Sequence, residues 1–261
     1  MLLCPKCQEK LVKQEHSYAC IHKHSFDISK EGYVNLLLKN SVNHGDSKEM
    51  VIARRNFLHN DYYLPMANKL IELITNKHPH TLIDLGCGEG YYTSLLQQSL
   101  QCELYANDVS KEAIKLAAKA NKNITYFIAS TASLPLPTNS FDIATCIFSY
   151  IDNKEIHRIL KKDGYLYTVM PAKNHLFSLK KVVYDTPYVN QENIPILEDF
   201  TLVATYPIDY TIHLDSSEKI KELFTMTPYY FKTSIQDFAK LDNISSLDIE
   251  VSFLINEYQA K

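Results

Sequence analysis

The sequence lacks a long apolar run and a secretion signal. No apolar stretch approaches the roughly 18 residues that a membrane-spanning helix needs, so we expect no membrane segment. The N-terminus reads Met-Leu-Leu-Cys-Pro-Lys-Cys, without the basic and apolar regions of a signal peptide. We therefore expect a cytoplasmic protein whose six cysteines stay reduced, which argues against a disulfide framework.

The chain also lacks internal repeats, low-complexity tracts and a strong net charge. Its formal net charge of -3 gives no general support for nucleic-acid binding. Residues 1–60 hold nine Lys and Arg against six Asp and Glu, whereas the remainder holds 18 against 24. This asymmetry is compatible with a partner-binding N-terminal segment and also with chance variation. Apolar residues make up 46% of the chain, which is enough for a buried core.

What is present is an alternation of short apolar strands and helices that begins at Thr81. The pattern predicts strands at 81–85, 103–108, 125–129, 142–148 and 165–170, with helices at 91–100, 111–121 and 153–160. Ser110 is placed to cap the second of these helices. Strands that alternate with helices indicate an α/β fold with a doubly wound, mostly parallel sheet.

The flanking regions have their own patterns. Apolar residues at intervals of three and four favour helix through most of 48–76, after a segment of loop composition at 38–48. Beyond residue 197 we expect strands at 201–212 and 247–258 around a helix near 216–224.

The cysteines nearest the N-terminus form a metal-binding pattern. Cys4-x2-Cys7 is followed after twelve residues by Cys20-x3-His24, and tetrahedral zinc needs four such ligands. His22 is the alternative to His24, but a single residue between it and Cys20 is awkward for chelation. Because protein fills all four positions, we expect a structural zinc site.

A glycine-rich turn follows the first strand, in the segment Asp84-Leu-Gly86-Cys-Gly88-Glu-Gly90. Such a turn brings backbone close to a ligand at the start of a helix, although NAD-binding loops use similar turns. Asp84 can bind the ammonium group of S-adenosylmethionine. The pyrophosphate of a dinucleotide would lie close to the same position, where a negative charge is unfavourable. Asp108 ends the next strand and can accept bonds from both ribose hydroxyls.

These residues resemble the motifs of class I S-adenosylmethionine-dependent methyltransferases. Asp84 with the three glycines matches the first motif, and Asp108 matches the second. The approach to the fourth strand is matched by Ala129-Ser130-Thr131-Ala132-x-Leu134-Pro135 and Phe141-Asp142. The resemblance implies a Rossmann-like, mostly parallel seven-stranded sheet.

The combination with the N-terminal cysteines is similar to the RlmA family of 23S rRNA (guanine-N1)-methyltransferases. The matching segments are Cys4-Pro5-x-Cys7, Tyr18-x-Cys20-x3-His24-x-Phe26-Asp27, Glu31-Gly32-Tyr33-Val34-Asn35-Leu36-Leu37, Gly45-Asp46-Ser47-x-Glu49-Met50, Ala53-Arg54-Arg55-x-Phe57-Leu58, Gly86-Cys87-Gly88-Glu89-Gly90-Tyr91-Tyr92-Thr93, His175-Leu176 and Met226-Thr227-Pro228. On this resemblance, residues 1–36 form a zinc-binding RNA-recognition module. Residues 37–60 form a connecting segment with a helix, and 61–261 form the methyltransferase domain.

The resemblance also implies ligands and partners. It assigns Cys4, Cys7, Cys20 and His24 to zinc, and Tyr63, Tyr92, Thr93 and His175 to the cofactor pocket. It further implies a guanine in the helix 35 hairpin of 23S rRNA as substrate, and a homodimer. The chain departs from the family after the fourth strand, where Phe148-Ser149-Tyr150 replaces the usual Ala-Pro. A tryptophan common near Met-Thr-Pro is also absent.

No residue is clearly the catalytic base. His175, Ser149 and Tyr150 are candidates near the expected methyl group, and His175 has the most suitable intrinsic pKa; the alternative for it is packing or cofactor lining. Arg54 and Arg55 are candidates for RNA phosphate contacts, with an ion-pair role as the alternative.

Tyr33 is expected either to stack on a base or to pack against the zinc module. Two other functions stay open at this point. One is methylation of a small molecule or a protein, and the other is non-catalytic RNA binding on a retained fold.

Overall fold

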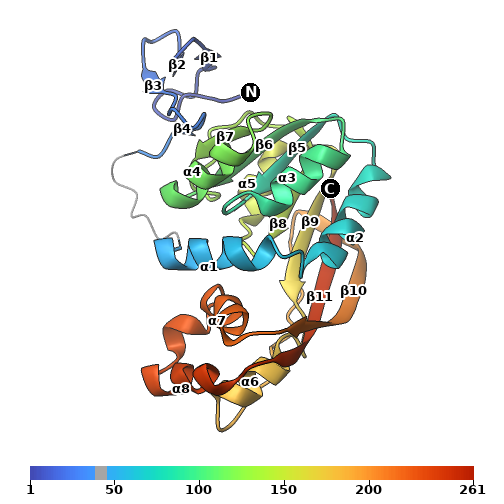
Figure 1. Ribbon diagram of the computed structural model, residues 1–261. Coiled ribbons are helices and arrows are strands. Elements are labelled where there is room, and N and C mark those ends of the chain that lie inside the picture. The colour runs from blue at the N-terminus through green and yellow to red at the C-terminus, as the bar shows by residue number, and fades with distance from the viewer. Residues whose placement is uncertain (39–45) are drawn as a thin grey trace.

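The N-terminal module is a small antiparallel sheet beside the edge of a much larger one. A computed structural model describes residues 1–38 and 46–261; part of the loop expected at 38–48, with Gly45, lies outside the described residues. Strands β1 (Val12–Lys13), β2 (Ser17–Ala19) and β3 (Ser25–Asp27) pair in that order. They lie at the top of Figure 1, at one end of the molecule.

The large sheet has eight strands in the order β10-β11-β9-β8-β5-β6-β7-β4. Its strands are β4 (Val34–Asn35), β5 (Thr81–Leu85), β6 (Glu103–Asp108), β7 (Thr125–Ile128), β8 (Phe141–Ile147), β9 (Leu160–Pro171), β10 (Phe200–Leu214) and β11 (Leu247–Ala260). Strand β11 runs antiparallel to both neighbours, and the pairs from β9 to β4 are parallel. The seven strands of the expected domain are therefore present, and the eighth is a two-residue strand from the N-terminal segment.

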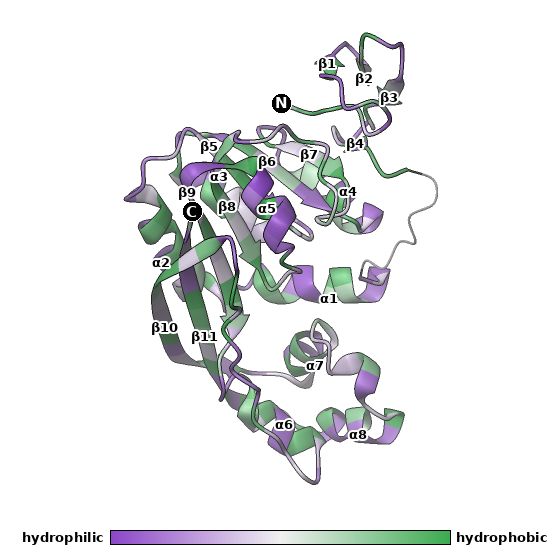
Figure 2. Cartoon of the chain, turned by 180° about the vertical axis from the view of Figure 1, so that it is seen from behind, coloured by the Kyte–Doolittle hydropathy of each residue, from purple (hydrophilic) through white to green (hydrophobic). Residues whose placement is uncertain are grey.

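Helices cover both faces of the sheet. They are α1 (Lys48–Leu58), α2 (Leu64–Thr75), α3 (Tyr91–Ser99), α4 (Lys111–Ala120), α5 (Asn153–Ile159), α6 (Phe177–Val183), α7 (Ser217–Thr225) and α8 (Ile235–Ala239), with short 3-10 turns at Tyr230–Lys232 and Lys240–Asn243. Ser110 caps α4 as predicted, since its side chain accepts a bond from Ala113 N. Helix α3 lies in front of the strands in Figure 1, and α5 lies in front when the molecule is seen from behind in Figure 2.

Alternating strand residues feed two cores. Leu82, Leu104 and Tyr126 point to the core that also holds residues of α2, α3 and α4. Ile83 and Tyr105 point to the other core, which holds residues of α5 and also Leu2 and Leu11 of the N-terminal module. The module thus shares a core with the α5 face of the large sheet.

The helix expected through 48–76 is interrupted. Helix α1 ends at Leu58 and α2 begins at Leu64, and Asp61 between them has a φ of 61°. Pro65 lies in the first turn of α2, where a missing backbone N–H costs no helical hydrogen bond. Tyr63, which lies in this break, is buried in the protein. In residues 1–38 and 46–261, the helices are too short or too polar to cross a membrane.

Candidate metal centre and active site

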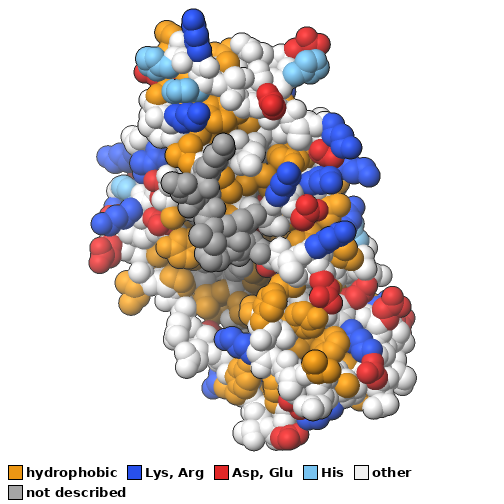
Figure 3. All heavy atoms as spheres, turned by 90° about the vertical axis from the view of Figure 1, so that its left-hand side faces the viewer, with side chains coloured by type: hydrophobic (Ala, Val, Ile, Leu, Met, Phe, Trp, Pro, Cys, Tyr) orange, Lys and Arg blue, Asp and Glu red, His pale blue; other side chains and the backbone are white. Residues whose placement is uncertain are grey.

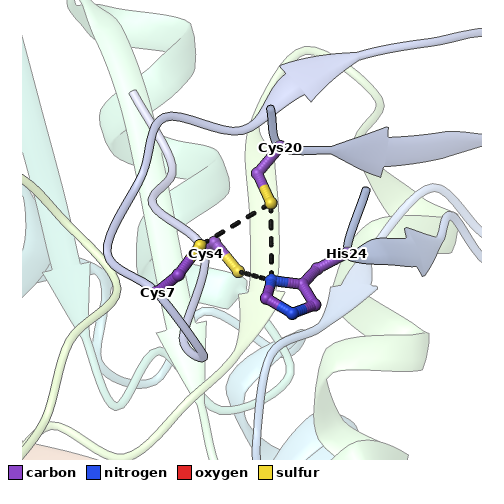
Figure 4. Close-up of side chains that lie close together, drawn as sticks. All are labelled: Cys4, Cys7, Cys20 and His24. Carbon is purple, nitrogen blue, oxygen red and sulfur yellow. Dashed lines mark hydrogen bonds between the residues drawn. The ribbon is translucent and has the colours of Figure 1, made fainter. Parts of the chain in front are cut away.

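The four predicted metal ligands converge on one point. Cys20 Sγ lies 3.7 Å from Cys7 Sγ and 3.5 Å from His24 Nδ1, and Cys4 Sγ lies 3.4 Å from the same nitrogen (Figure 4). A tetrahedral zinc ion with ordinary bond lengths separates two sulfurs by about 3.8 Å, and a sulfur and a nitrogen by about 3.5 Å. The donor set therefore fits zinc. His24 is the histidine of this cluster, whereas His22 is exposed, which confirms the predicted choice.

Tight turns present the ligands. In the first turn Gln8 N donates to Cys4 O, and in the second Lys23 N donates to Cys20 O, at 2.8 and 2.9 Å. Gln8 and Lys23 have φ values of 60° and 65°, the left-handed conformation that closes such turns. The two turns place each ligand pair on its own chelating loop, which is the arrangement that the spacing predicted.

A cavity of about 960 Å³ opens at the carboxyl ends of the parallel strands. This is where open α/β sheets bind their ligands. Its wall contains the predicted site residues Arg54, Tyr63, Asp84, Gly86, Gly88, Tyr92, Asp108, Ser149, Tyr150 and His175. Met226, Thr227 and Pro228, which follow α7, also belong to the wall.

Two glycines of the loop serve different purposes. A Cβ at Gly88 would meet only Arg54 Nη1 at 3.8 Å, so this backbone faces open cavity and lets a ligand approach. A Cβ at Gly90 would lie 2.8 Å from Ala117 Cβ and 2.9 Å from Tyr126 Oη. Gly90 therefore permits packing against α4, and it does not line the cavity.

Asp84 is buried at the end of β5 with a hydroxyl on each carboxylate oxygen. Thr93 Oγ1 donates to it at 2.5 Å and Thr145 Oγ1 at 2.8 Å. Burial raises the pKa of Asp84 to about 6, although the two hydroxyl bonds oppose the shift. Thr93 is not part of the cavity wall, so its role is to hold the carboxylate of Asp84, which is.

Asp108 holds the glycine loop in place. Its carboxylate accepts bonds from Gly88 N at 2.9 Å and Ser110 N at 2.7 Å. Burial raises its pKa, and the two backbone donors work in the opposite direction. A carboxylate has about four lone-pair sites, so two remain for the hydroxyls of a ribose.

Aromatic rings form the far end of the cavity. Tyr63, Tyr92, Phe148, His175 and Phe253 lie in one cluster, with centroid distances from 4.5 to 6.5 Å. The hydroxyls of Tyr63 and Tyr92 are buried and have no hydrogen-bond partner among the described residues. Orphaned hydroxyls are uncommon in folded proteins and are consistent with a site shaped for a polar ligand.

The three candidate bases lie near this end but differ in their surroundings. Burial lowers the pKa of His175 to about 3, and its Nδ1 accepts Ser252 N at 3.3 Å, so it is a weak proton acceptor at neutral pH. Ser149 Oγ donates to Leu85 O at 2.6 Å, which commits its proton to the fold. Tyr150 is 67% exposed at the cavity mouth.

Arg54 and Arg55 point in different directions, as two successive residues of a helix must. Arg54 pairs with Asp46, donates to Met226 O and lines the cavity. Arg55 Nη1 lies 2.8 Å from the buried carboxylate of Glu89, which His59 also approaches at 3.4 Å. Helix α1, which belongs to the expected connecting segment 37–60, therefore brings Arg54 to the cavity wall.

Tyr33 is buried at 6% exposure, so packing replaces base stacking for this residue. Sequence reasoning missed Thr145, the second partner of Asp84, and Phe253 in the aromatic cluster. Neither has a local signal, because each is an ordinary strand residue until pairing brings its strand beside the cavity.

Comparisons with known proteins agree with this geometry. A family profile described as "Methyltransferase domain" matches residues 83–168, and one described as "RlmA, N-terminal" matches residues 2–48. YxjB of Bacillus subtilis (strain 168), named provisionally as a 23S rRNA (guanine-N(1)-)-methyltransferase, is 32% identical over 272 residues, covering 96% of this chain and 94% of that protein. The 23S rRNA (guanine(748)-N(1))-methyltransferase of Streptomyces fradiae is 30% identical over 184 residues, covering 68% of this chain and 66% of that protein.

A solved structure supports the fold. The YcgJ protein of Bacillus subtilis superposes with a TM-score of 0.51 at 18% identity, covering 75% of this chain and 97% of that one. The sheet, the glycine loop and the cavity define an S-adenosylmethionine-dependent methyltransferase that carries an N-terminal zinc ribbon. The chain belongs to the RlmA family of 23S rRNA (guanine-N1)-methyltransferases.

Proposed function

We propose that this enzyme methylates N1 of a guanine in the helix 35 hairpin of 23S rRNA. The observation that carries the proposal is the likeness, over nearly the full length, to a protein named as a 23S rRNA (guanine-N(1)-)-methyltransferase. The cavity supports it, because the glycine loop and Asp108 suit the cofactor, while Phe148 and Tyr150 in the wall are left for an acceptor. S-adenosylmethionine supplies an electrophilic methyl group when bound.

The acceptor must reach the cavity as an unpaired base. Guanine N1 carries its proton on the Watson–Crick edge, which is inaccessible inside a paired helix. Phe148 and Tyr150 are 44% and 67% exposed at the cavity wall and offer ring faces to such a base. We infer that the chain contributes mainly alignment of N1 with the methyl group, because His175 is held neutral and Ser149 is engaged.

The remaining site assignments belong to this proposal. Tyr63, Asp84, Gly86, Gly88, Gly90, Tyr92, Thr93, Asp108 and His175 are proposed for the cofactor site, whether by contact or by support. Arg54 and Arg55 keep a proposed RNA role, although both have ion-pair partners in the chain. A homodimer and action in the cytoplasm, where ribosomal RNA is made, complete the proposal.

Primer extension on 23S rRNA tests the function. A methyl group on guanine N1 blocks base pairing, so rRNA from cells with the gene should stop reverse transcriptase in helix 35. The stop should vanish in a deletion strain and return with the wild-type gene, but not with Asp108→Ala. A deletion strain that keeps the stop, or a wild-type strain without one, would refute the substrate.

A further inference from the structure

Helix α4 carries an exposed row of lysines. Lys111, Lys115 and Lys119 recur every four residues, and Lys122 follows just after the helix; all four are exposed. The opposite side of α4 is apolar, with Ala113, Ile114, Ala117 and Ala118 buried in the core. Residues four apart share one face of a helix, so Lys111, Lys115 and Lys119 form a single row. Together with Lys122, which follows the helix, they are here called the α4 lysine row.

The row makes no ion pair within the described part of the chain. Among the ion pairs of the described residues, none involves Lys111, Lys115, Lys119 or Lys122; Lys122 Nζ donates instead to the backbone carbonyl of Glu31. Glu112 is the acidic residue of α4 itself. Four positive charges against one stand out in a chain whose formal net charge is -3.

The position of the row connects the two ends of the site. Helix α4 starts at Lys111, directly after Asp108, Val109 and Ser110, and the first two of these line the cavity. At its other end Lys122 reaches Glu31 of the zinc module, across a recess that Lys13, Glu15 and Glu31 also line. From Lys111 to Lys119 the rise along α4 is about 12 Å, which is on the order of three to four base-pair steps along the axis of a duplex.

Figure 3 shows the side of the molecule on which α4 and the zinc module lie in Figure 1. On this face Lys and Arg side chains gather below the module, to the right of the centre. A surface with this sign, length and direction complements a phosphate backbone that runs from the cavity toward the module.

We propose that the α4 lysine row binds the sugar-phosphate backbone of the rRNA hairpin whose base enters the cavity. The proposal rests on the proposed function, which supplies RNA as the partner. In it the cavity takes the guanine, the lysine row follows the adjoining strand, and the zinc module contacts the far end. The row thus sets affinity and orientation without reading sequence.

The test measures binding of a helix 35 transcript across a salt series. Each phosphate contact lowers the slope of log K against log salt by about 0.7 to 0.9. Lys115→Ala with Lys119→Ala should therefore flatten the slope by about 1.5. The affinity gap to wild type should then shrink by about eightfold between 50 and 200 mM salt. Replacement of both residues by arginine should keep the wild-type slope, because the charge is retained.

A matched control removes two lysines from the other side of the sheet. Lys154 on α5 and Lys162 on β9 are exposed and absent from the ion pairs. Lys154→Ala with Lys162→Ala gives the same net charge but should leave the slope unchanged. Equal slopes for the two double alanine variants would overturn the proposal, as would a wild-type slope in the α4 variant.

The two proposals fail separately. Methylation of helix 35 by wild type, combined with unaltered RNA binding by the α4 variant, refutes the row and keeps the function. Binding that depends on the row, without any methyl transfer to the hairpin, refutes the substrate and keeps the row as an RNA surface. The affinity for S-adenosylmethionine, measured by calorimetry, should be the same in all variants and excludes general misfolding.

Discussion

Different interactions stabilise the fold of the N-terminal module and the fold of the large α/β region. In the module the three strands are two or three residues long, and its buried apolar side chains are few. The α/β region buries helices and strands on both sheet faces. A unit of about 30 residues cannot bury enough apolar surface to fold alone, so the metal must supply the missing stability. The large region has an extensive apolar core, and some of its buried polar groups, such as Asp84 and Thr168, line the cavity.

The two regions are nevertheless joined. The N-terminal ammonium donates to Tyr105 Oη at 2.7 Å, and Leu3 N donates to Pro135 O at 2.7 Å. Val34 and Asn35 add β4 to the edge of the large sheet. None of these contacts involves the turns that carry the zinc ligands, so the metal is what holds those turns in place. Metal loss should therefore unfold the turns first.

The largest effect should come from loss of a zinc ligand. Structural zinc contributes about 10 to 16 kcal/mol in zinc-finger peptides. Cys20→Ser should abolish the zinc found by metal analysis of purified protein and make residues 1–30 sensitive to protease. The α/β region should keep its fold and its cofactor affinity, because none of its elements contributes a ligand.

The control for this prediction is His22→Ala, which removes an exposed histidine from the same turn. It should retain zinc and protease resistance. Zinc retained in Cys20→Ser, or lost in His22→Ala, would show that the ligand set is different. Unfolding of both regions on metal loss would contradict the inference that only the N-terminal module depends on the metal.

The second prediction concerns a carboxylate that the α/β region buries at a cost. The pKa of Asp84 is about 6 in the folded state against an ordinary value of 3.8. The folded state therefore holds the proton between these values, and stability falls as pH rises from about 4 to 6. Asp84→Asn removes this penalty and should raise the free energy of unfolding of the cofactor-free protein at pH 8 by about 2 to 3 kcal/mol.

Urea unfolding at pH 4 and pH 8 measures the difference. The gain should be present at pH 8 and largely absent at pH 4, where wild type is also protonated. Asp142→Asn is the comparison, since Asp142 pairs with Lys161 at 2.6 Å and its loss should destabilise the protein at pH 8. An Asp84→Asn protein that is less stable at pH 8 would show that the carboxylate is held in its charged form.

The third prediction concerns the cofactor. Each charge-assisted bond from Asp108 to a ribose hydroxyl is worth about 1.5 to 3 kcal/mol. Asp108→Ala should weaken S-adenosylmethionine binding by about tenfold or more in calorimetry, partly because Gly88 N and Ser110 N lose their acceptor. Glu112→Ala, an exposed change two residues beyond Ser110, should not alter it. Unchanged affinity in Asp108→Ala would remove this residue from the cofactor site.

The smallest effect is expected for the arginines between the two regions. The double change of Arg54 and Arg55 to alanine should flatten the salt dependence of RNA binding by about one to two units of slope and leave cofactor affinity unchanged, because each arginine is proposed to contact a phosphate. A wild-type slope combined with lower stability would contradict this prediction and show that the two arginines serve their ion pairs with Asp46 and Glu89. Calorimetry and the salt series on the same protein separate these outcomes.

Local patterns predicted most of the fold. The strands at 81–85 and 103–108 were predicted to the residue, and the metal ligands were predicted from spacing alone. These signals are local, because a buried strand, a capped helix and a chelating pair each need only neighbours in sequence. The break between α1 and α2 was missed, since the helical spacing on either side of 59–63 does not show that Asp61 takes a φ of 61°.

The sequence by itself determined the zinc ligands, the glycine loop and the alternating α/β elements, because short-range periodicity and spacing encode them. Tertiary structure alone decided that Val34–Asn35 extends the large sheet, that Arg54 faces the cavity and that Thr145 meets Asp84. Tertiary structure also decided that the lysines of α4 lie between the cavity and the zinc module. Their spacing marks one face of a helix, but only the packing of α4 between the cavity and the zinc module gives that face a direction. Such contacts depend on chain segments far apart in sequence, so no local pattern contains them.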